Sequence, residues 1–197
     1  MSKKILIVGG VAGGASAAAR MRRLDESAEI IMFERGEYIS FANCGLPYYI
    51  GETIKEREAL LVQTPEAMKA RFNIDVRVNS DVAGIDVNSK KVTVNSSDRG
   101  TYEESYDYII LSPGAKPIAP PIKGIDSSRI YKLRNVPDTD KIKAVVDSKK
   151  ITSAVVIGGG FIGIETAENL KERGIKVTLV EAAPHILAPF DTEMAVI

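Results

Sequence analysis

The sequence predicts an α/β fold built from two similar βαβ units. Residues 3–36 and 151–184 share one pattern: a short apolar run, a glycine cluster, an alanine-rich or amphipathic stretch, a second apolar run and a glutamate. Short, continuous apolar runs are typical of parallel strands buried on both faces. Glycines between a strand and a helix are typical of Rossmann-like units. We therefore expect two Rossmann-like domains, the first with a β-meander and the second incomplete.

The segment between the two units predicts further elements in order. Residues 37–72 contain the only cysteine and a predicted helix with Thr64 as N-cap and Pro65 as its first residue. Residues 74–111 hold four strand-like runs, and a polar loop is predicted over residues 95–105. We interpret these runs as a meander that returns to a parallel strand.

A proline-rich stretch follows at residues 112–124 and is expected to be a crossover between domains. Residues 136–148 are predicted to form a helix capped by an aspartate or threonine. The last residues resemble the start of another helix, so we expect a piece of a longer protein. The predicted organisation is the first segment of one domain at 1–114, a crossover at 115–150 and a truncated second domain at 151–197.

Composition excludes several classes of function. Lys and Arg together number 26, as do Asp and Glu, so the net charge is zero and neither a nucleic acid nor a membrane surface is an expected partner. No apolar run approaches the roughly 20 residues of a membrane-spanning helix. A single cysteine excludes a disulfide within the chain. We expect a cytoplasmic protein without a metal site.

The second glycine cluster predicts a nicotinamide nucleotide site. Gly158, Gly160 and Gly163 form a complete G-x-G-x-x-G, with Ile162 inside it. Such glycines permit a tight turn, close approach of a pyrophosphate and close packing of helix on strand. Glu181 ends the next strand, where a carboxylate accepts hydrogen bonds from ribose hydroxyls and repels a 2′-phosphate. The site therefore favours NADH over NADPH.

The first glycine cluster is a weaker match. Gly9 and Gly14 fit the ends of the pattern, but Val11 occupies the position of the middle glycine. Glu34 closes this unit as Glu181 closes the other. The cluster either binds a second nucleotide or is a structural turn. Two nucleotide sites in one chain would suggest an electron relay between a flavin and a nicotinamide.

Cys44 follows the first unit, and Pro47 suits the first turn of a helix, so the cysteine is expected at a helix N-terminus. Helix amides there stabilise a thiolate. Without a second cysteine, its oxidised form would be a mixed disulfide with a small thiol or a sulfenic acid. The alternative is a buried, inert cysteine.

Four stretches resemble the flavin-dependent pyridine nucleotide–disulfide oxidoreductases: "SFANCGLPYYIGE", "GGVAGGASAAAR", "YDYIILSPGAKP" and "VVIGGGFIGIETAENL". The similarity is to the single-cysteine branch, which contains the coenzyme A disulfide reductases and the CoA-dependent NAD(P)H persulfide reductases. The resemblance implies a homodimer in which electrons pass from NAD(P)H through FAD to Cys44. It implies that oxidised Cys44 is a mixed disulfide with CoA.

The resemblance implies that residues 1–114 are the first segment of an FAD-binding domain and that residues 151–197 are a truncated NAD(P)-binding domain. It also implies site residues. Glu165 would face the nicotinamide. The implied FAD contacts are Gly9, Gly10, Val11, Ala12, Gly13, Gly14, Glu34, Arg35, Asn43, Cys44, Val82, Ser112 and Gly114. The implied CoA contacts are Ser16, Arg20, Arg23, Ser40, Asn43 and Arg71.

Two alternatives stay open. NADH oxidases and peroxidases, which use a cysteine sulfenic acid, are similar but carry a histidine inside the first glycine loop, and this chain has none there. Its single histidine, His185, is expected to be a loop residue. A nucleotide-binding redox sensor without turnover is the other alternative. Because a second flavin-binding segment and a dimerisation domain are expected beyond these residues, the chain alone is expected to be inactive.

Overall fold

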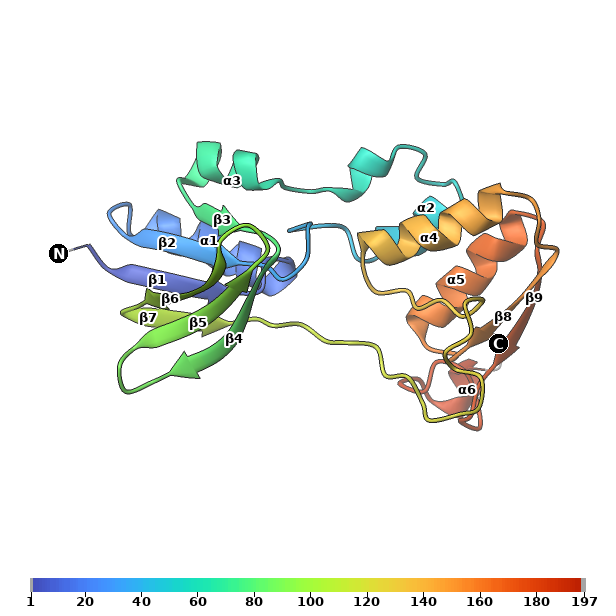
Figure 1. Cartoon of the computed structure of the whole chain (residues 1–197). Coiled ribbons are helices and arrows are strands. Elements are labelled where there is room, and N and C mark those ends of the chain that lie inside the picture. Colours follow the sequence, from blue (N-terminus) through green and yellow to red (C-terminus); the bar gives the residue numbers. More distant parts are fainter. Residues whose placement is uncertain (1, 196–197) are drawn as a thin grey trace. The chain divides into compact units, whose positions relative to one another are not determined.

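The computed structural model describes residues 2–195, shown as a ribbon in Figure 1. The chain forms two compact units. The first holds the residues up to Phe41 together with Leu61–Ala115, and the second holds Ala42–Leu60 and the residues from Lys116 onward. The segment around Cys44, which the sequence analysis assigned to the first domain, thus packs within the second unit.

The first unit is built on a four-stranded parallel sheet in the order β3-β2-β1-β7. Helices α1 and α3 accompany this sheet, and a three-stranded antiparallel sheet, β4-β5-β6, forms the meander. The bounds are β1 Lys4–Val8, α1 Ala12–Leu24, β2 Glu29–Phe33, α3 Pro65–Phe72, β3 Asp75–Arg77, β4 Ser80–Asp86, β5 Lys91–Ser96, β6 Gly100–Ser105 and β7 Tyr108–Leu111.

Alternate residues of β1 and β2 enter two different cores, as expected for strands buried on both faces. Ile5 and Ile30 pack with residues of α1 and α3, including Ala18 and Met68. Neighbouring residues such as Leu6, Ile31 and Phe33 pack on the other side against Val92 and Val94 of the meander. The parallel sheet is therefore covered by helices on one face and by the meander on the other.

Two sequence predictions in this region are wrong. Residues 95–105 are not one polar loop: β5 continues to Ser96, and β6 pairs with it antiparallel after a turn in which Gly100 has a φ of 69°. Alternation places Tyr102 against the core while its neighbours face outward, so a polar-rich run still forms a strand. The run at Asp75–Arg77 belongs to the parallel sheet beside β2, not to the meander.

An ion-pair cluster joins the two sheets of the first unit. Arg77 Nη1 donates to Glu104 Oε2 at 2.6 Å, and Lys4 Nζ donates to Glu104 Oε1 at 2.5 Å. The Arg77 guanidinium also lies over the rings of Phe33 and Tyr102. Burial works against the charge of Glu104, but the hydrogen bonds from Lys4 and Arg77 outweigh it and lower the pKa of this carboxyl.

The second unit contains a two-stranded parallel sheet, β8-β9, packed on one face by helices. Buried Ile50, Val146, Leu170 and Ile175 form its core, whereas Val155 on the other side of β8 is exposed. The bounds are α2 Gly45–Ile50, the 3₁₀ helix η1 Arg57–Leu60, α4 Val136–Asp147, β8 Ser153–Ile157, α5 Phe161–Glu172, β9 Lys176–Val180 and α6 Thr192–Ala195.

The predicted helix starts are mostly confirmed. Thr64 caps α3 by accepting from the Ala67 amide at 3.2 Å, and Pro65 is the first residue of that helix. Helix α4 begins at Val136, the first residue of the predicted range, but its cap is neither an aspartate nor a threonine. Its N-cap is Asn135, whose side chain accepts from the Asp138 amide at 3.0 Å.

The Glu104 cluster should make the first unit sensitive to acid. The folded pKa of Glu104 is lowered, so the unfolded state takes up a proton more readily and stability falls as the pH drops below the ordinary glutamate pKa of about 4.3. We expect Glu104→Gln to be less stable than wild type at neutral pH and to lose less stability on acidification. Chemical denaturation followed by circular dichroism at a series of pH values measures this.

Glu103→Gln is the matched control, because Glu103 is an exposed neighbour on the same strand that pairs with Lys91. Equal loss of stability in the two variants as the pH falls would contradict the role assigned to the Glu104 cluster.

Candidate functional site

The first glycine loop is a tight turn that places the start of α1 against the end of β1. Gly9 has a φ of 99°, and a side chain there would collide with the Ser112 carbonyl. A side chain at Gly14 would collide with the Gly9 carbonyl. Glycine at these two positions is therefore required by the packing of the loop itself.

The N-terminus of α1 is open to an anion. Val11 is the N-cap but makes no side-chain cap hydrogen bond, and the first turn contains no acidic residue. The first amides of a helix lack intrahelical partners and point at whatever lies beyond the N-terminus. Residues Gly9, Gly10, Val11, Ala12, Gly13 and Gly14 therefore form a loop and helix start with the chemistry that binds a pyrophosphate.

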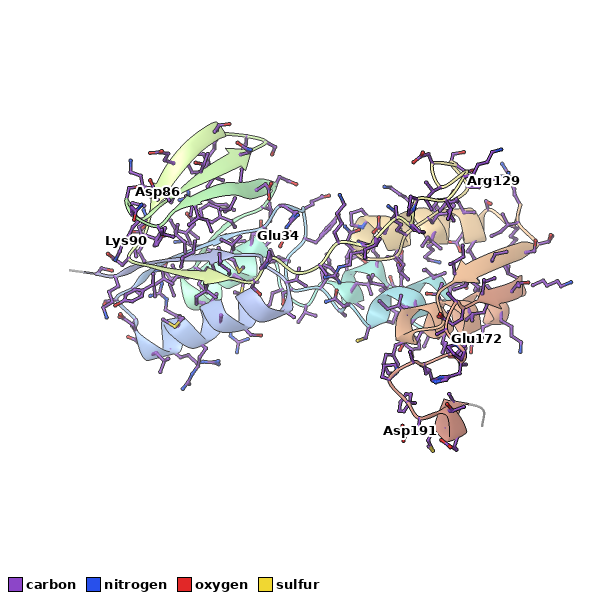
Figure 2. All side chains as sticks on the ribbon, turned by 90° about the horizontal axis from the view of Figure 1, so that it is seen from below. Glu34, Asp86, Lys90, Arg129, Glu172 and Asp191 are labelled. Carbon is purple, nitrogen blue, oxygen red and sulfur yellow. The ribbon has the colours of Figure 1, made fainter. Side chains whose placement is uncertain are left out.

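Glu34, labelled in Figure 2, follows β2 directly and is hydrogen-bonded to the loop. Its Oε2 accepts from the Gly10 amide at 2.8 Å, and its Oε1 accepts from the Gly36 amide at 2.8 Å. Each carboxylate oxygen has a second lone pair, so both can also accept from a ribose hydroxyl. The two amides fix the carboxylate beside the turn.

Ser112 and the residues after it complete this site. The Ser112 amide donates to the Val8 carbonyl at 2.7 Å, and its Oγ occupies the space that a side chain on Gly13 would need. Arg35 Nη2 donates to the Pro113 carbonyl at 3.4 Å, and Gly114 has a φ of 71°. Val82, by contrast, lies on β4 and packs against the core of the meander.

The predicted CoA-contacting residues of α1 share one face. Ser16, Arg20 and Arg23 are all exposed and follow each other at spacings of four and three residues. Arg22 between them is buried and donates to main-chain carbonyls, including Phe72 O at 2.7 Å, so its role is structural. Arg71 is exposed on α3.

Ser40 and Asn43 precede the cysteine but fall in different units. The Ser40 amide donates to the Gly10 carbonyl at 3.0 Å, so Ser40 adjoins the first glycine loop. Asn43 lies in the second unit, where its Oδ1 accepts from Arg134 Nη1 at 3.3 Å.

Cys44 is exposed and is the N-cap of α2. Pro47 lies in the first turn of that helix, as predicted. The alternative of an inert cysteine assumed that Cys44 is buried, and its exposure contradicts that assumption. Gly45 behind it is buried and closely packed against Leu60 and Ile54, so the helix start is fixed while the thiol is accessible.

The second glycine loop repeats the geometry of the first. Gly158 has a φ of 106°, and a side chain at Gly163 would collide with the Gly158 carbonyl. A side chain at Gly160 would meet no atom within 4 Å. Internal packing thus does not require glycine at position 160, and its missing side chain leaves room in front of α5 for a ligand.

Glu181 holds the same relation to this loop as Glu34 does to the first. Its Oε2 accepts from the Gly159 amide at 2.5 Å and its Oε1 accepts from the Ala183 amide at 2.7 Å. The hydrogen bonds from Ala183 and Gly159 lower the pKa of Glu181. The carboxylate is therefore charged at neutral pH and suited to repel a phosphate.

The other predicted residues of this unit lie nearby on α5 or in a loop. Ile162 is exposed in the first turn of α5, and Glu165 is half-buried one turn later. His185 is a loop residue, with Nδ1 2.8 Å from the Ile186 carbonyl oxygen.

Sequence reasoning missed the contacts that hold α2. Thr139 Oγ1 donates to the Leu46 carbonyl at 2.9 Å, and Arg173 Nη1 donates to the Ile50 carbonyl at 2.9 Å. Both partners are distant in sequence, so no local pattern could reveal them.

Within residues 2–195, no three His, Cys, Asp or Glu side chains are grouped as a metal site would need. None of the helices in this described part has both the length and the apolar character of a membrane-spanning segment.

Comparisons with known proteins agree with this geometry. The family model for pyridine nucleotide-disulphide oxidoreductases matches residues 3–197. The chain is 42% identical over 193 residues to coenzyme A disulfide reductase of Staphylococcus haemolyticus, covering 98% of this chain and 43% of that protein. It therefore spans less than half the length of the curated relatives it matches.

Solved structures give the same result. Reduced CoADR-RHD of Bacillus anthracis superposes with a TM-score of 0.96 at 62% identity, over 99% of this chain and 35% of that one. The NAD-dependent persulfide reductase of A. fulgidus superposes with a TM-score of 0.93 at 36% identity, over 98% and 37%. With two glycine loops of matching geometry and a family match along almost its whole length, the chain belongs to the pyridine nucleotide-disulphide oxidoreductase family.

Proposed function

We propose that the full-length protein is an FAD-containing, NADH-dependent reductase of CoA disulfide or CoA persulfide, with Cys44 as its redox centre. One observation carries the proposal: the only cysteine is exposed at the start of α2, in a chain with two glycine loops. The names of the relatives, a coenzyme A disulfide reductase and an NAD-dependent persulfide reductase, support the substrate class.

The residues of the first loop fit the diphosphate and ribose of FAD. The helix start offers amides without a competing side chain, and Glu34 is fixed where it can accept hydrogen bonds from ribose hydroxyls. Bound FAD would take two electrons from NADH and give them to a disulfide. The proposed contacts are Gly9, Gly10, Val11, Ala12, Gly13, Gly14, Glu34, Arg35, Asn43, Cys44, the backbone near Val82, Ser112 and Gly114.

The second loop fits NADH in the same way. The open space in front of Gly160 admits a pyrophosphate. The charged Glu181 can accept hydrogen bonds from ribose hydroxyls and repels a 2′-phosphate. Glu165, half-buried on α5, is proposed to face the nicotinamide. Gly158, Ile162 and Gly163 complete the set.

Cys44 would act by thiol–disulfide exchange. Its thiolate attacks one sulfur of CoA disulfide, the Cys44–S–S–CoA bond forms, and one CoA thiolate leaves. The hydride of NADH supplies two electrons and one proton, and solvent supplies a second proton. The mixed disulfide is thereby reduced to the Cys44 thiolate and a second CoA thiol, so two CoA thiols form for each NADH oxidised.

The exposed face of α1 is proposed to bind the phosphates of CoA. Arg20 and Arg23 supply fixed positive charge and forked donors, which suit phosphate oxygens. Ser16 adds a hydroxyl on the same face. Ser40, Asn43 and Arg71 are proposed as further CoA contacts.

We further propose that the full-length protein is a homodimer and that it acts in the cytoplasm.

Replacement of the cysteine should separate binding from chemistry. In the full-length enzyme, Cys44→Ser should keep the fold and the flavin because serine is nearly isosteric. It should reduce the rate of CoA disulfide reduction by about a thousandfold or more, as loss of a nucleophile does elsewhere. NADH consumption with CoA disulfide measures the rate, and flavin absorbance is the control. Undiminished activity in this variant would refute the role of Cys44.

Glu181 should set the choice of nicotinamide. We expect the full-length wild type to prefer NADH over NADPH by at least about tenfold in kcat/KM, or about 1.4 kcal/mol. Glu181→Gln removes the charge that repels a 2′-phosphate, so the ratio should move toward one. Glu168→Gln, which removes a charge at an exposed position on α5, should leave the ratio unchanged. A wild type that prefers NADPH tenfold would overturn the assignment.

A further inference from the structure

Helix α2, which begins at Cys44, is too short to hold its own position. It contains six residues, Gly45–Ile50, whereas isolated helices need about 12–15 residues to be even marginally stable. Its place must therefore be set by what it packs against. Within the second unit it packs against both α4 and α5, which Figure 1 shows beside it.

The first anchor is a buried hydroxyl on α4. Thr139 is fully buried, with 0% of its surface exposed, and its Oγ1 donates to the Leu46 carbonyl at 2.9 Å. Leu46 is two residues from Cys44. A buried hydroxyl needs a partner, as does the carbonyl that it contacts, so this bond fixes the first turn of α2 against α4.

The second anchor is a cation at the other end of the helix. Arg173 Nη1 donates to the Ile50 carbonyl at 2.9 Å, which satisfies one of the last carbonyls of α2. Its Nη2 donates to Asp147 Oδ1 at 2.8 Å, and Nη1 lies 3.3 Å from Glu52 Oε1. The guanidinium is therefore itself held in place by α4 and by the residues after α2.

The third anchor is a close contact without a side chain. A side chain at Gly51, directly after α2, would collide with Asn169 Oδ1. Asn169 is 3% exposed and donates its Nδ2 to the Glu165 carbonyl at 2.7 Å. Its Oδ1 has no hydrogen-bond partner among the described residues, so it faces the backbone of Gly51. Helix α5 thus begins at the second glycine loop, and the last turns of α5 support the end of α2.

We propose that Thr139 and Arg173 are positioning residues for the Cys44 thiol. They hold α2 by two main-chain carbonyls, and Asn169 supports it through Gly51. Thiol–disulfide exchange needs the attacking sulfur aligned with the disulfide bond, and small misplacements of a reacting group can cost about a hundredfold in rate. The inference rests on the proposed function, because only that function gives the Cys44 thiol a bound disulfide to attack.

The test compares two disulfides in the full-length enzyme. Reduced enzyme is mixed with CoA disulfide, and the release of CoA in a single turnover is measured. A parallel reaction uses 5,5′-dithiobis(2-nitrobenzoate), a small disulfide that reaches an exposed thiol by free collision. Thr139→Val removes the hydroxyl but keeps the shape. Thr139→Ser keeps the hydroxyl, and Thr178→Val makes the same exchange at an exposed position on β9.

Thr139→Val should release CoA about tenfold or more slowly than wild type. Its reaction with the small disulfide and its flavin reduction by NADH should stay within about twofold, because the thiol and the flavin step do not depend on that alignment. Thr139→Ser should restore the rate, and Thr178→Val should match wild type. Arg173→Met should show the same split, which keeps the test informative if Thr139→Val folds poorly.

Two results would overturn the inference. One is release of CoA at the wild-type rate in both Thr139→Val and Arg173→Met. The other is equal slowing with both disulfides, which would indicate general loss of structure. Failure of the wild type itself to release CoA would instead refute the proposed function, and this outcome is recognised without any variant.

Discussion

Each glycine loop depends on one close contact, in which its last glycine lies against the carbonyl oxygen of its first. Gly14 meets the Gly9 carbonyl, and Gly163 meets the Gly158 carbonyl, with no room for a side chain. Because of this contact each helix starts directly at the end of a strand. The open amides of the helix and the glutamate after the next strand then both lie beside the glycine loop. Glu34 and Glu181 each accept from an amide of the glycine loop, which completes the same arrangement twice.

Much of this arrangement could be predicted from sequence because it is local. The glycine spacing, the apolar strand runs, the Thr64 cap and the position of Cys44 before a helix all depend on neighbours within a few residues. The two wrong predictions in the first unit fail for a different reason. Strand β6 is rich in polar residues because one face is exposed, and β3 is assigned by pairing with β2, which local pattern does not specify.

The setting of the cysteine could not be predicted for the same physical reason. Thr139 and Arg173 contact Leu46 and Ile50 across more than 90 residues of sequence. A short helix gains its stability from packing rather than from propensity, so its partners decide where it lies. The position of the accessible thiol is thus set by tertiary contacts of α2 with α4, α5 and the residue after α5.

The proposed function depends on a mixed disulfide between Cys44 and CoA. Mass spectrometry can detect this adduct on the reduced full-length protein after incubation with CoA disulfide in the absence of NADH. We expect one reductant-labile adduct of CoA mass on the peptide that contains Cys44, with release of one equivalent of free CoA. An unmodified Cys44 peptide with no CoA released would contradict it.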